Sequence, residues 1–404
     1  MNNEKAEDQA GKTAEILLKI RSWANENPSR PEAARLKEWL GRKERREKAE
    51  PLIDMFAWIG CQKDLRPLGL TILESLRGMK LVDIMQISER RMIFLLVGIV
   101  MARLNNTKLK ENVLNPLTAF ESLSRTAEFL QTEFAFSCVP DISAFAESYG
   151  CKVKIPEDAI PTVTGHSIGN LDDLARLEAS GPQWHDRLMN NFTVLGLMAE
   201  RFTLFKLVLG GGPFSMAAIL AGLEPLAKKA IKDPEFVERL LEFCTNISTL
   251  AAQMMVSAGA SFIYLGDPTS SLLSRKQYER FAAPYIKRVV DAVDVPVILH
   301  VCGKSSHIIE PMCATGAQGI SLDTLVDLPS IVSRVPSDVA IIGNLDPVGP
   351  LLNGTPEEAA AVTRELLDSM RDVPNYVFSA GCEVALETPP ENIKAMIDTV
   401  KSYH

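Results

Sequence analysis

The sequence predicts a (β/α)8 barrel, and three observations lead to that prediction. Short apolar segments with strand character alternate with helical segments from about residue 92 to the end of the chain. The strand-like segments number eight, which is the number of strand–helix units in a closed parallel barrel of this type. No Gly-x-Gly-x-x-Gly fingerprint follows any of them. That weakens the alternative, an open doubly wound sheet, which would fit if one or two segments were wrongly assigned as strands.

Residues 1–70 are expected to form a helical extension ahead of a barrel that covers 71–404. Two apolar stripes mark helices on either side of a break at Pro28 and Pro31. The stripes consist of Ile16, Leu17, Leu18, Ile20 and Trp23, and of Leu36, Trp39 and Leu40. The mixed-charge run 42–48 is either a solvated helix face or an arm that docks a partner. Further helices are expected over 51–88.

Each predicted strand is a short apolar run bounded by turn residues. The eight strands are expected at Met92–Val100, Phe134–Cys138, Leu204–Leu209, Phe262–Leu265, Val295–Val301, Gly319–Leu322, Val339–Ile342 and Tyr376–Ser379. The main helices between and after them are expected near 117–131, 142–149, 215–222, 234–257, 274–293, 308–315, 328–335, 357–372 and 391–401. Residues 151–170 are rich in Pro and Gly and are expected to be mostly loop.

Composition favours a soluble, cytoplasmic protein. The chain has 404 residues, 46% of them apolar, and a net charge of −8 from 43 basic and 51 acidic side chains. That balance argues against general binding to nucleic acid or to anionic membranes, but not against a small anionic substrate. The seven cysteines show no disulfide spacing and are expected to be reduced. The polar N-terminus is no signal peptide, and the longest apolar run, Met92–Ala102, is too short to span a bilayer.

The fifth predicted strand ends with His300 and Cys302, two residues apart. In an extended strand such residues point to the same face, so an imidazole and a thiol project together where a buried strand ends. Gly303 then allows a sharp exit. Imidazole and thiolate together are typical zinc ligands. The alternative is a packed histidine beside an inert core thiol, which is the more common fate of an isolated His-x-Cys pair.

Other strand ends carry further groups that can bind metal or substrate. Because chemistry in a barrel collects at the carboxyl ends of the strands, these residues are expected to share one mouth. They are Asp267 after the fourth strand, Asp323 after the sixth, Asn344 after the seventh and Cys382 after the eighth. Barrel closure brings the eighth strand beside the first, so Cys382 can face His300. A His/Cys/Cys set binds zinc and leaves a fourth position, which Asp323 can fill. Cys313 and His307 are expected to have packing and supporting roles.

The order of motifs resembles the uroporphyrinogen decarboxylase superfamily, and within it the zinc-dependent corrinoid methyltransferases such as methylcobamide:coenzyme M methyltransferases. The resemblance spans roughly residues 70–404. The motifs in the second half are His300-Val-Cys302-Gly303-Lys304, Gly319-Ile-Ser321-Leu-Asp323, Gly343-Asn344-Leu-Asp346-Pro347, Gly381-Cys382 and Thr388-Pro389-Pro-Glu391-Asn392-Ile393. Those upstream are Ala144-Phe-Ala-Glu147-Ser-Tyr-Gly150, Gly212-Pro213-Phe214 and Asp267-Pro268. The His-x-Cys and Gly-Cys pair is specific to the methyltransferase branch.

The resemblance implies zinc held by His300, Cys302 and Cys382, with Asp323 as a resting fourth ligand. The usual family residue at that position is Glu, and the shorter Asp departs from the pattern. It also implies a methylated corrinoid (cobalamin), carried by a separate protein, as methyl donor. A small acceptor thiol such as coenzyme M would displace Asp323, bind as a zinc thiolate and attack the methyl group. Tetrahydrofolate is an alternative acceptor.

Candidate substrate contacts are Asp267, Asn344, Lys304 and Phe214. The alternative for Asp267 and Asn344 is a structural role in a turn or a helix cap. The alternative for Lys304, Arg275 and Lys276 is an ordinary solvent-exposed surface charge. Uroporphyrinogen decarboxylase activity is a weaker alternative, because the segment after the first strand contains a single arginine, Arg103, where the decarboxylases carry an Arg-rich motif. A non-catalytic zinc- or corrinoid-binding barrel is a third. The N-terminal helices are a candidate contact surface for a homo-oligomer.

Overall fold

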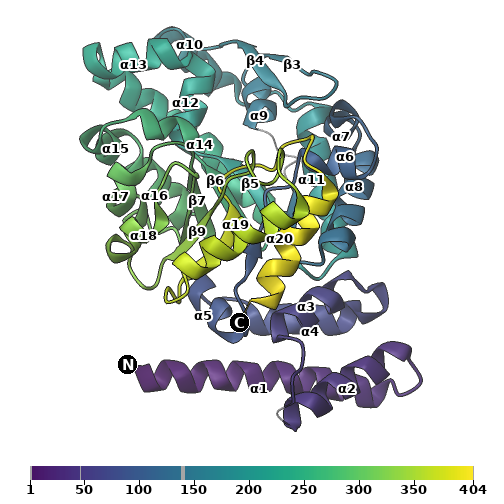
Figure 1. Cartoon of the computed structure of the whole chain (residues 1–404). Helices are drawn as coiled ribbons and strands as arrows, with labels where there is room; N and C mark the ends of the chain where they lie inside the picture. Colours follow the sequence, from purple (N-terminus) through teal and green to yellow (C-terminus); the bar gives the residue numbers. More distant parts are fainter. Residues whose placement is uncertain (1, 46, 138–141, 404) are drawn as a thin grey trace.

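Eight parallel strands form one sheet that curls into a nearly closed barrel, which confirms the predicted fold class (Figure 1). The computed structural model describes residues 2–45, 47–137 and 142–403. Neighbouring strands follow the order β1-β10-β9-β8-β7-β6-β5-β2. Their bounds are β1 (Ile93–Phe94), β2 (Phe134–Ser137), β5 (Phe205–Gly211), β6 (Phe262–Gly266), β7 (Val297–Val301), β8 (Gly319–Leu322), β9 (Ala340–Leu345) and β10 (Tyr376–Ala380).

Helices surround the sheet and connect consecutive strands, as right-handed parallel connections require (Figure 1). The first two connections contain α6 (Val100–Leu104), α7 (Leu109–Leu114), α8 (Pro116–Leu130), α9 (Ile142–Ser148), α10 (Leu171–Ser180) and α11 (Asp186–Arg201). The next two contain α12 (Pro213–Ala221), α13 (Leu223–Lys232), α14 (Pro234–Ser257), the 3-10 turn η2 (Pro268–Leu272), α15 (Arg275–Phe281) and α16 (Ala283–Asp291). The remaining helical elements are η3 (Ser306–Ile308), α17 (Ile309–Cys313), α18 (Leu328–Ile331), η4 (Val332–Arg334), α19 (Pro356–Ser369) and α20 (Pro390–Ser402).

The segment 151–170 is mostly loop, as expected, and also contains the hairpin β3 (Lys152–Lys154) and β4 (Thr162–Gly165). Two expectations about local structure were wrong. The first strand is only Ile93–Phe94, because the apolar run that follows it enters α6 at Val100. A continuous apolar run lacks the periodicity that separates a buried strand from a buried helix start. Leu18 is exposed on its helix, because it lies two residues from Ile16 and Ile20, on the opposite face. Cys138, the last residue of the second predicted strand, lies outside the described residues.

The barrel interior is filled by a column of aromatic rings. Phe56 of the extension meets Phe205 at a ring separation of 4.8 Å, and Phe205 meets Phe262 at 5.3 Å. Further up, Phe94 and Tyr264 stack at 5.2 Å, and Tyr264 stacks on His300 at 5.1 Å. Aromatic contacts at these separations stabilise a core beyond the burial of their surface. The column links the amino-terminal end of the barrel, called the base here, to the carboxyl-terminal end, called the mouth.

A buried carboxylate joins the two strands at the ends of the sheet order, β1 and β2. Glu133, one residue before β2, accepts a hydrogen bond from the Ile93 amide of β1 at 2.5 Å. Its other oxygen pairs with Arg90 at 3.1 Å, and Arg90 pairs with Asp54 at 2.6 Å. The Arg90 and Glu133 side chains are 1% and 0% exposed. Burial without partners would be costly for each group, so the network satisfies its members while it closes the barrel seam.

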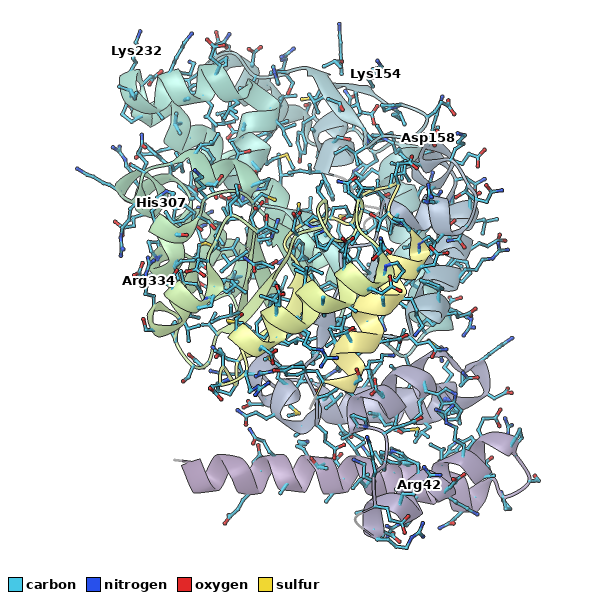
Figure 2. The ribbon with its side chains drawn as sticks, viewed as in Figure 1. Arg42, Lys154, Asp158, Lys232, His307 and Arg334 are labelled. Carbon is cyan, nitrogen blue, oxygen red and sulfur yellow. The ribbon has the colours of Figure 1, made fainter. Side chains whose placement is uncertain are left out.

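The N-terminal helices cover the base (Figure 1). They are α1 (Asn2–Glu26), α2 (Pro31–Glu44), α3 (Leu52–Cys61), the 3-10 turn η1 (Lys63–Leu65), α4 (Arg66–Leu76) and α5 (Leu81–Ile87). Arg66 donates to the carbonyls of Glu200 and Ala199 at the end of α11, which fixes α4 to the barrel wall. Arg42 lies at the extension end of the molecule, and Lys154 and Asp158 lie at the hairpin end (Figure 2).

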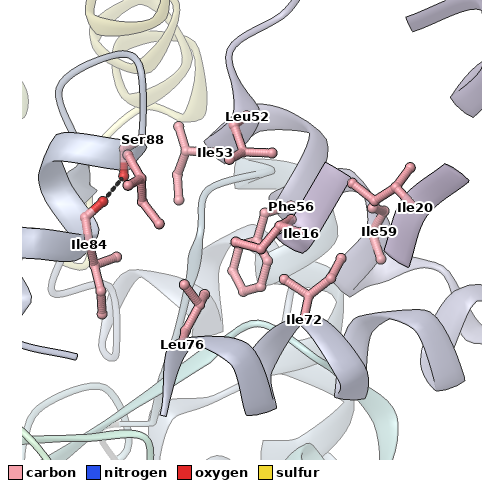
Figure 3. A pocket seen from close by; sticks show the side chains of 11 residues that line it. Ile16, Ile20, Leu52, Ile53, Phe56, Ile59, Ile72, Leu76, Ile84 and Ser88 are labelled. Atoms are coloured by element: carbon pink, nitrogen blue, oxygen red, sulfur yellow. Dashed lines mark hydrogen bonds between the residues drawn. The ribbon is translucent and has the colours of Figure 1, made fainter. Parts of the chain in front are cut away.

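Apolar side chains of α1, α3, α4 and α5 pack around a small cavity of about 20 Å³ (Figure 3). The Ser88 hydroxyl at its edge donates to the Ile84 carbonyl at 2.7 Å, so no polar group is left facing the apolar space. Ile16 and Ile20 of α1 reach the cavity, as the predicted stripe requires. None of the described helices combines the length and apolar character needed to cross a bilayer.

Candidate metal centre at the barrel mouth

Three electron-pair donors converge at the mouth from two strands that are far apart in the sequence. His300 is the penultimate residue of β7, Cys302 directly follows that strand, and Cys382 lies two residues after the end of β10. The His300 Nε2 lies 2.7 Å from the Cys302 sulfur, which lies 3.5 Å from the Cys382 sulfur. All three donor atoms lie within 4.8 Å of one another. The donors meet because the barrel places the carboxyl ends of β7 and β10 at the same mouth.

The imidazole of His300 is fixed in orientation and tautomer. The ring is 5% exposed and stacks on the buried ring of Tyr264. Its Nδ1 lies 3.2 Å from the Ser321 carbonyl oxygen, and a carbonyl only accepts, so Nδ1 carries the proton. The Ser321 hydroxyl lies 3.2 Å from Nδ1 and 3.1 Å from the Tyr264 hydroxyl. The lone pair of Nε2 therefore points toward Cys302, which is the arrangement of a metal-binding histidine.

The two thiols titrate as a pair. A hydrogen bond from Cys302 lowers the pKa of Cys382, and the neighbouring His300 lowers it further against the effect of burial. The same contact with Cys382, followed by burial, raises the pKa of Cys302. One proton is therefore lost readily and the second is held, as expected for two interacting acids in a half-buried position. A cation that replaces the second proton would relieve this repulsion, and the soft N/S/S donor set fits Zn²⁺.

Asp323 lies beside this group but outside the set of converging donors. Its carboxylate accepts from the Gly303 amide at 3.0 Å and from the Leu325 amide at 3.0 Å. Gly303 has φ of +80°, so only a residue without a side chain turns there easily and presents its amide to Asp323. Asn344 supports the same loop by donating to the Asp323 carbonyl at 2.9 Å. Both residues thus order the exits of β7 and β8.

The exits of β8 and β10 approach each other closely. A Cβ added to Gly381 would lie 2.6 Å from the amide nitrogen of Thr324. Glycine before Cys382 therefore lets the third donor come near the loop that contains Asp323. The next residue, Glu383, is half-buried and accepts from the Ile99 amide at 2.9 Å, and burial of its carboxyl group raises its pKa to about 8. These contacts fix the backbone on either side of Cys382.

Asp267 directly follows β6, next to the site, and is fully buried. Its amide donates to the His300 carbonyl at 2.8 Å, and its Oδ1 accepts from the Ser215 amide at 2.6 Å. Its Oδ2 has no hydrogen-bond partner among the described residues. Burial raises the pKa of Asp267 to about 6, against the lowering effect of the Ser215 contacts. The carboxyl therefore caps α12 and places its second oxygen near the start of that helix.

The remaining candidates have separate positions. Lys304 is exposed just beyond Gly303, whereas Phe214 is 2% exposed and packs in the core at the start of α12. His307 lies on the outside of the barrel and contacts the Leu273 carbonyl at 2.8 Å (Figure 2). Arg275 forms ion pairs with Glu279 and Glu310. Sequence reasoning did not single out Ser321, Tyr264 or Glu383. Ser321 pairs in register with His300, which is a signal that strand alignment would have given.

Comparisons with known proteins agree with this architecture. The family model for uroporphyrinogen decarboxylase (URO-D) matches residues 71–403. A methylcobamide:CoM methyltransferase, MtbA of Methanosarcina acetivorans, is 33% identical over 294 residues, which are 70% of this chain and 85% of the relative. A methylated-thiol–coenzyme M methyltransferase of Methanosarcina mazei is 30% identical over 273 residues, 65% of this chain and 70% of the relative. A uroporphyrinogen decarboxylase of Prochlorococcus marinus is 33% identical over 221 residues, 53% of this chain and 59% of the relative.

A solved methyltransferase structure from Methanosarcina mazei has the same fold. It superposes with a TM-score of 0.68 at 22% sequence identity and covers 77% of this chain and 94% of its own.

Proposed function

The chain belongs to the uroporphyrinogen decarboxylase family, and we propose that it is a zinc-dependent methyltransferase that moves a methyl group from a methylated corrinoid to a small thiol. The observation that supports this most is the convergence of His300, Cys302 and Cys382 within 4.8 Å at the mouth. The methyltransferase relatives match 70% and 65% of the chain, and the decarboxylase relatives match up to 61%. We divide the chain into an extension, residues 1–70, and the catalytic barrel, residues 71–404.

His300, Cys302 and Cys382 would hold the metal. When bound, Zn²⁺ would supply a Lewis acid that keeps an acceptor thiol deprotonated near neutral pH. The Ser321 carbonyl and hydroxyl keep the His300 Nδ1 protonated, so that Nε2 remains a donor atom. Two thiolates and one neutral imidazole give the protein donors a charge of −2, which leaves the acceptor sulfur electron-rich and nucleophilic.

The methyl transfer is a displacement at carbon. The acceptor sulfur forms a bond to the methyl carbon while the cobalt–carbon bond breaks, and the electron pair of that bond stays on cobalt as Co(I). The products are a thioether and the reduced corrinoid. The role of the chain is to hold the sulfur still and to exclude other nucleophiles, which favours reaction through proximity. The corrinoid is a substrate here, delivered by a corrinoid protein that must present its methyl face to the mouth.

Five neighbours would support the substrates. We propose Asp323 as a fourth donor that an acceptor displaces, although binding through its carboxylate requires release of the Gly303 or Leu325 amide. Exposed Lys304 would attract an anionic acceptor such as the sulfonate of coenzyme M. Asp267, with one unpartnered oxygen among the described residues, would orient substrate. Asn344 holds the Asp323 loop, and buried Phe214 would act through packing.

Coenzyme M is the first acceptor to test, because two relatives are named for it. Methylcobalamin and coenzyme M are incubated with the full chain, and the loss of methylcobalamin absorbance and the formation of methyl-coenzyme M are both followed. We expect transfer that stops after treatment with a chelator and returns with added Zn²⁺. Homocysteine and tetrahydrofolate are tested in parallel, and tetrahydrofolate as sole acceptor would change the acceptor class to nitrogen.

Two outcomes contradict the proposal. Stoichiometric zinc without transfer to any of the three acceptors would favour a binding protein over an enzyme. Release of carbon dioxide from uroporphyrinogen that persists in His300→Ala would show a decarboxylase that has no use for the metal site. A matched control is Cys313→Ser, because Cys313 lies in α17 outside the donor group and should retain full transfer.

A further inference from the structure

A groove at the base of the barrel contains a buried lysine that the proposed reaction does not use. The groove, called the basal groove here, has a volume of about 370 Å³. Its apolar walls come from the extension and from the barrel, and include Leu70, Leu73, Leu76, Phe205, Val295 and Pro296. Lys206 of β5 also lines it and is 6% exposed. The groove thus combines an apolar body with one buried ammonium group.

Lys206 has no acidic partner. Its Nζ donates to the Leu204 carbonyl at 3.1 Å, and no carboxylate in the described part of the chain lies within ion-pair distance. Burial, together with a smaller effect of the nearby cation Arg66, lowers the pKa of Lys206 to about 8. Lysine is rarely buried unless it is paired, and an unpaired buried charge is expensive. A bound anion would supply the missing partner.

The other charges of the groove limit what kind of anion fits. Glu74 pairs with Arg77 on α4, and both side chains are largely exposed, at 65% and 80%. Asp294, before β7, is exposed as well. The acidic groups therefore lie on the solvent side, while Lys206 lies at the buried end. This arrangement favours a single negative charge inside and repels ligands that carry further negative charge at the opening.

We propose that the basal groove binds a small monocarboxylate with an apolar body, whose carboxylate pairs with Lys206 and whose hydrocarbon part packs between α4 and β5–β7. A charge-assisted hydrogen bond in a partly desolvated groove is stronger than its exposed equivalent. Such a ligand would touch both the extension and the barrel, so it would stabilise their packing by binding only the folded state. The site is independent of the metal centre at the opposite end of the barrel.

The test compares hexanoate with 1-hexanol, which has the same chain without the charge. Binding to the full chain at pH 7 is measured by titration calorimetry and by the shift in Tm. We expect hexanoate to bind at one site and at least about tenfold more tightly than hexanol. Lys206→Met should remove that preference, whereas Lys37→Met, an exposed lysine on α2, should retain it. Affinity for hexanoate should fall from pH 7 to pH 9.5 as Lys206 loses its proton.

Three results would overturn the proposal. They are equal binding of hexanoate and hexanol, hexanoate binding that survives Lys206→Met, and hexanoate binding that is lost equally in Lys37→Met. If Lys206→Met does not fold, Val295→Trp provides a second route, because a bulky side chain in the groove wall should block hexanoate while Lys206 remains. The charged groups in and beside the groove are Arg66, Glu74, Arg77 and Asp294.

Discussion

At the base of the barrel Arg90 lies between two carboxylates, whereas at the mouth two thiols and an imidazole turn their donor atoms toward one another. Both clusters are buried or half-buried and both join segments far apart in the sequence. Arg90 and Lys401, which lies 4.0 Å from Asp54, balance the two carboxylates at the base, so that network is complete within the protein. At the mouth, the nitrogen and sulfur atoms point their electron lone pairs toward one another. This arrangement is stable only when a proton or a cation lies among them. A buried polar cluster of the first kind holds the fold, and one of the second kind binds a ligand.

The largest expected effect is loss of metal from the mouth. Cys302→Ser or Cys382→Ser should weaken zinc binding by more than about 100-fold, because loss of a direct donor exceeds the effect of the groups behind it. Metal content after dialysis and competition with a chromophoric chelator measure the change. Cys313→Ser provides the matched cysteine control. Zinc retained at one equivalent in both variants would mean that the donor group is not a metal site.

Disrupting the ion-pair network of Arg90 at the base should destabilise the fold without affecting metal binding. Arg90→Met leaves Glu133 buried without a counter-charge, while Asp54 keeps Lys401 at 4.0 Å. The unpaired Glu133 should cost about 3–5 kcal/mol in free energy of unfolding. Urea denaturation measures the loss. Arg125→Met, which removes an exposed pair with Glu121, should change stability by less than about 1 kcal/mol. If Arg90→Met were as stable as the parent chain, the seam network would have no structural role.

Lys206 differs from the paired charges at the base, because it has no carboxylate partner among the described residues. It should make the stability of the fold depend on pH. Its folded pKa of about 8 lies below the ordinary lysine value, so between about pH 8 and 10.4 the unfolded chain binds more protons than the folded chain. The contribution of Lys206 to stability therefore rises with pH across this window, by about 3 kcal/mol in total. Urea midpoints of the parent and of Lys206→Met measure it, and the variant should lack the rise. A parallel pH profile in both proteins would contradict this assignment.

The smallest expected effect concerns the groups behind His300. Tyr264→Phe and Ser321→Ala should lower zinc affinity by about 10- to 100-fold while the fold is kept, because these hydroxyls orient the imidazole. Chelator competition measures the affinity, and the visible spectrum of the Co²⁺ form reports the ligand geometry. Tyr278→Phe is the control, since its buried hydroxyl has no hydrogen-bond partner among the described residues. An unchanged zinc affinity in both test variants would mean that Ser321 and Tyr264 contribute only to packing.

Most of the fold could be predicted from the sequence, because most of the barrel strands are short apolar runs that end near Gly, Asp or Asn, whereas the apolar run of β1 continues toward a helix. The convergence of His300, Cys302 and Cys382 also followed, since strand parity and barrel closure are properties of the chain order. The supporting contacts did not follow. Ser321 and Tyr264 meet His300 only through the register of β6–β8, and Arg90, Glu133 and Asp54 look like ordinary surface charges until the seam is seen. Asp323 was expected to face the metal, and its bonds to the Gly303 and Leu325 amides depend on loop geometry that no spacing encodes.

The seam between β1 and β2 has a consequence for motion. Strand β1 contributes two residues to the ladder with β10, and the Ile93 amide is held by the side chain of Glu133. A joint made by one side chain opens more easily than a ladder of backbone hydrogen bonds, because a single rotation releases it. Amide protons at Ile93 should therefore exchange with solvent sooner than those of β6 and β7, each of which pairs with a strand on both sides. The seam between β1 and β2 is therefore the line along which the barrel should open most readily.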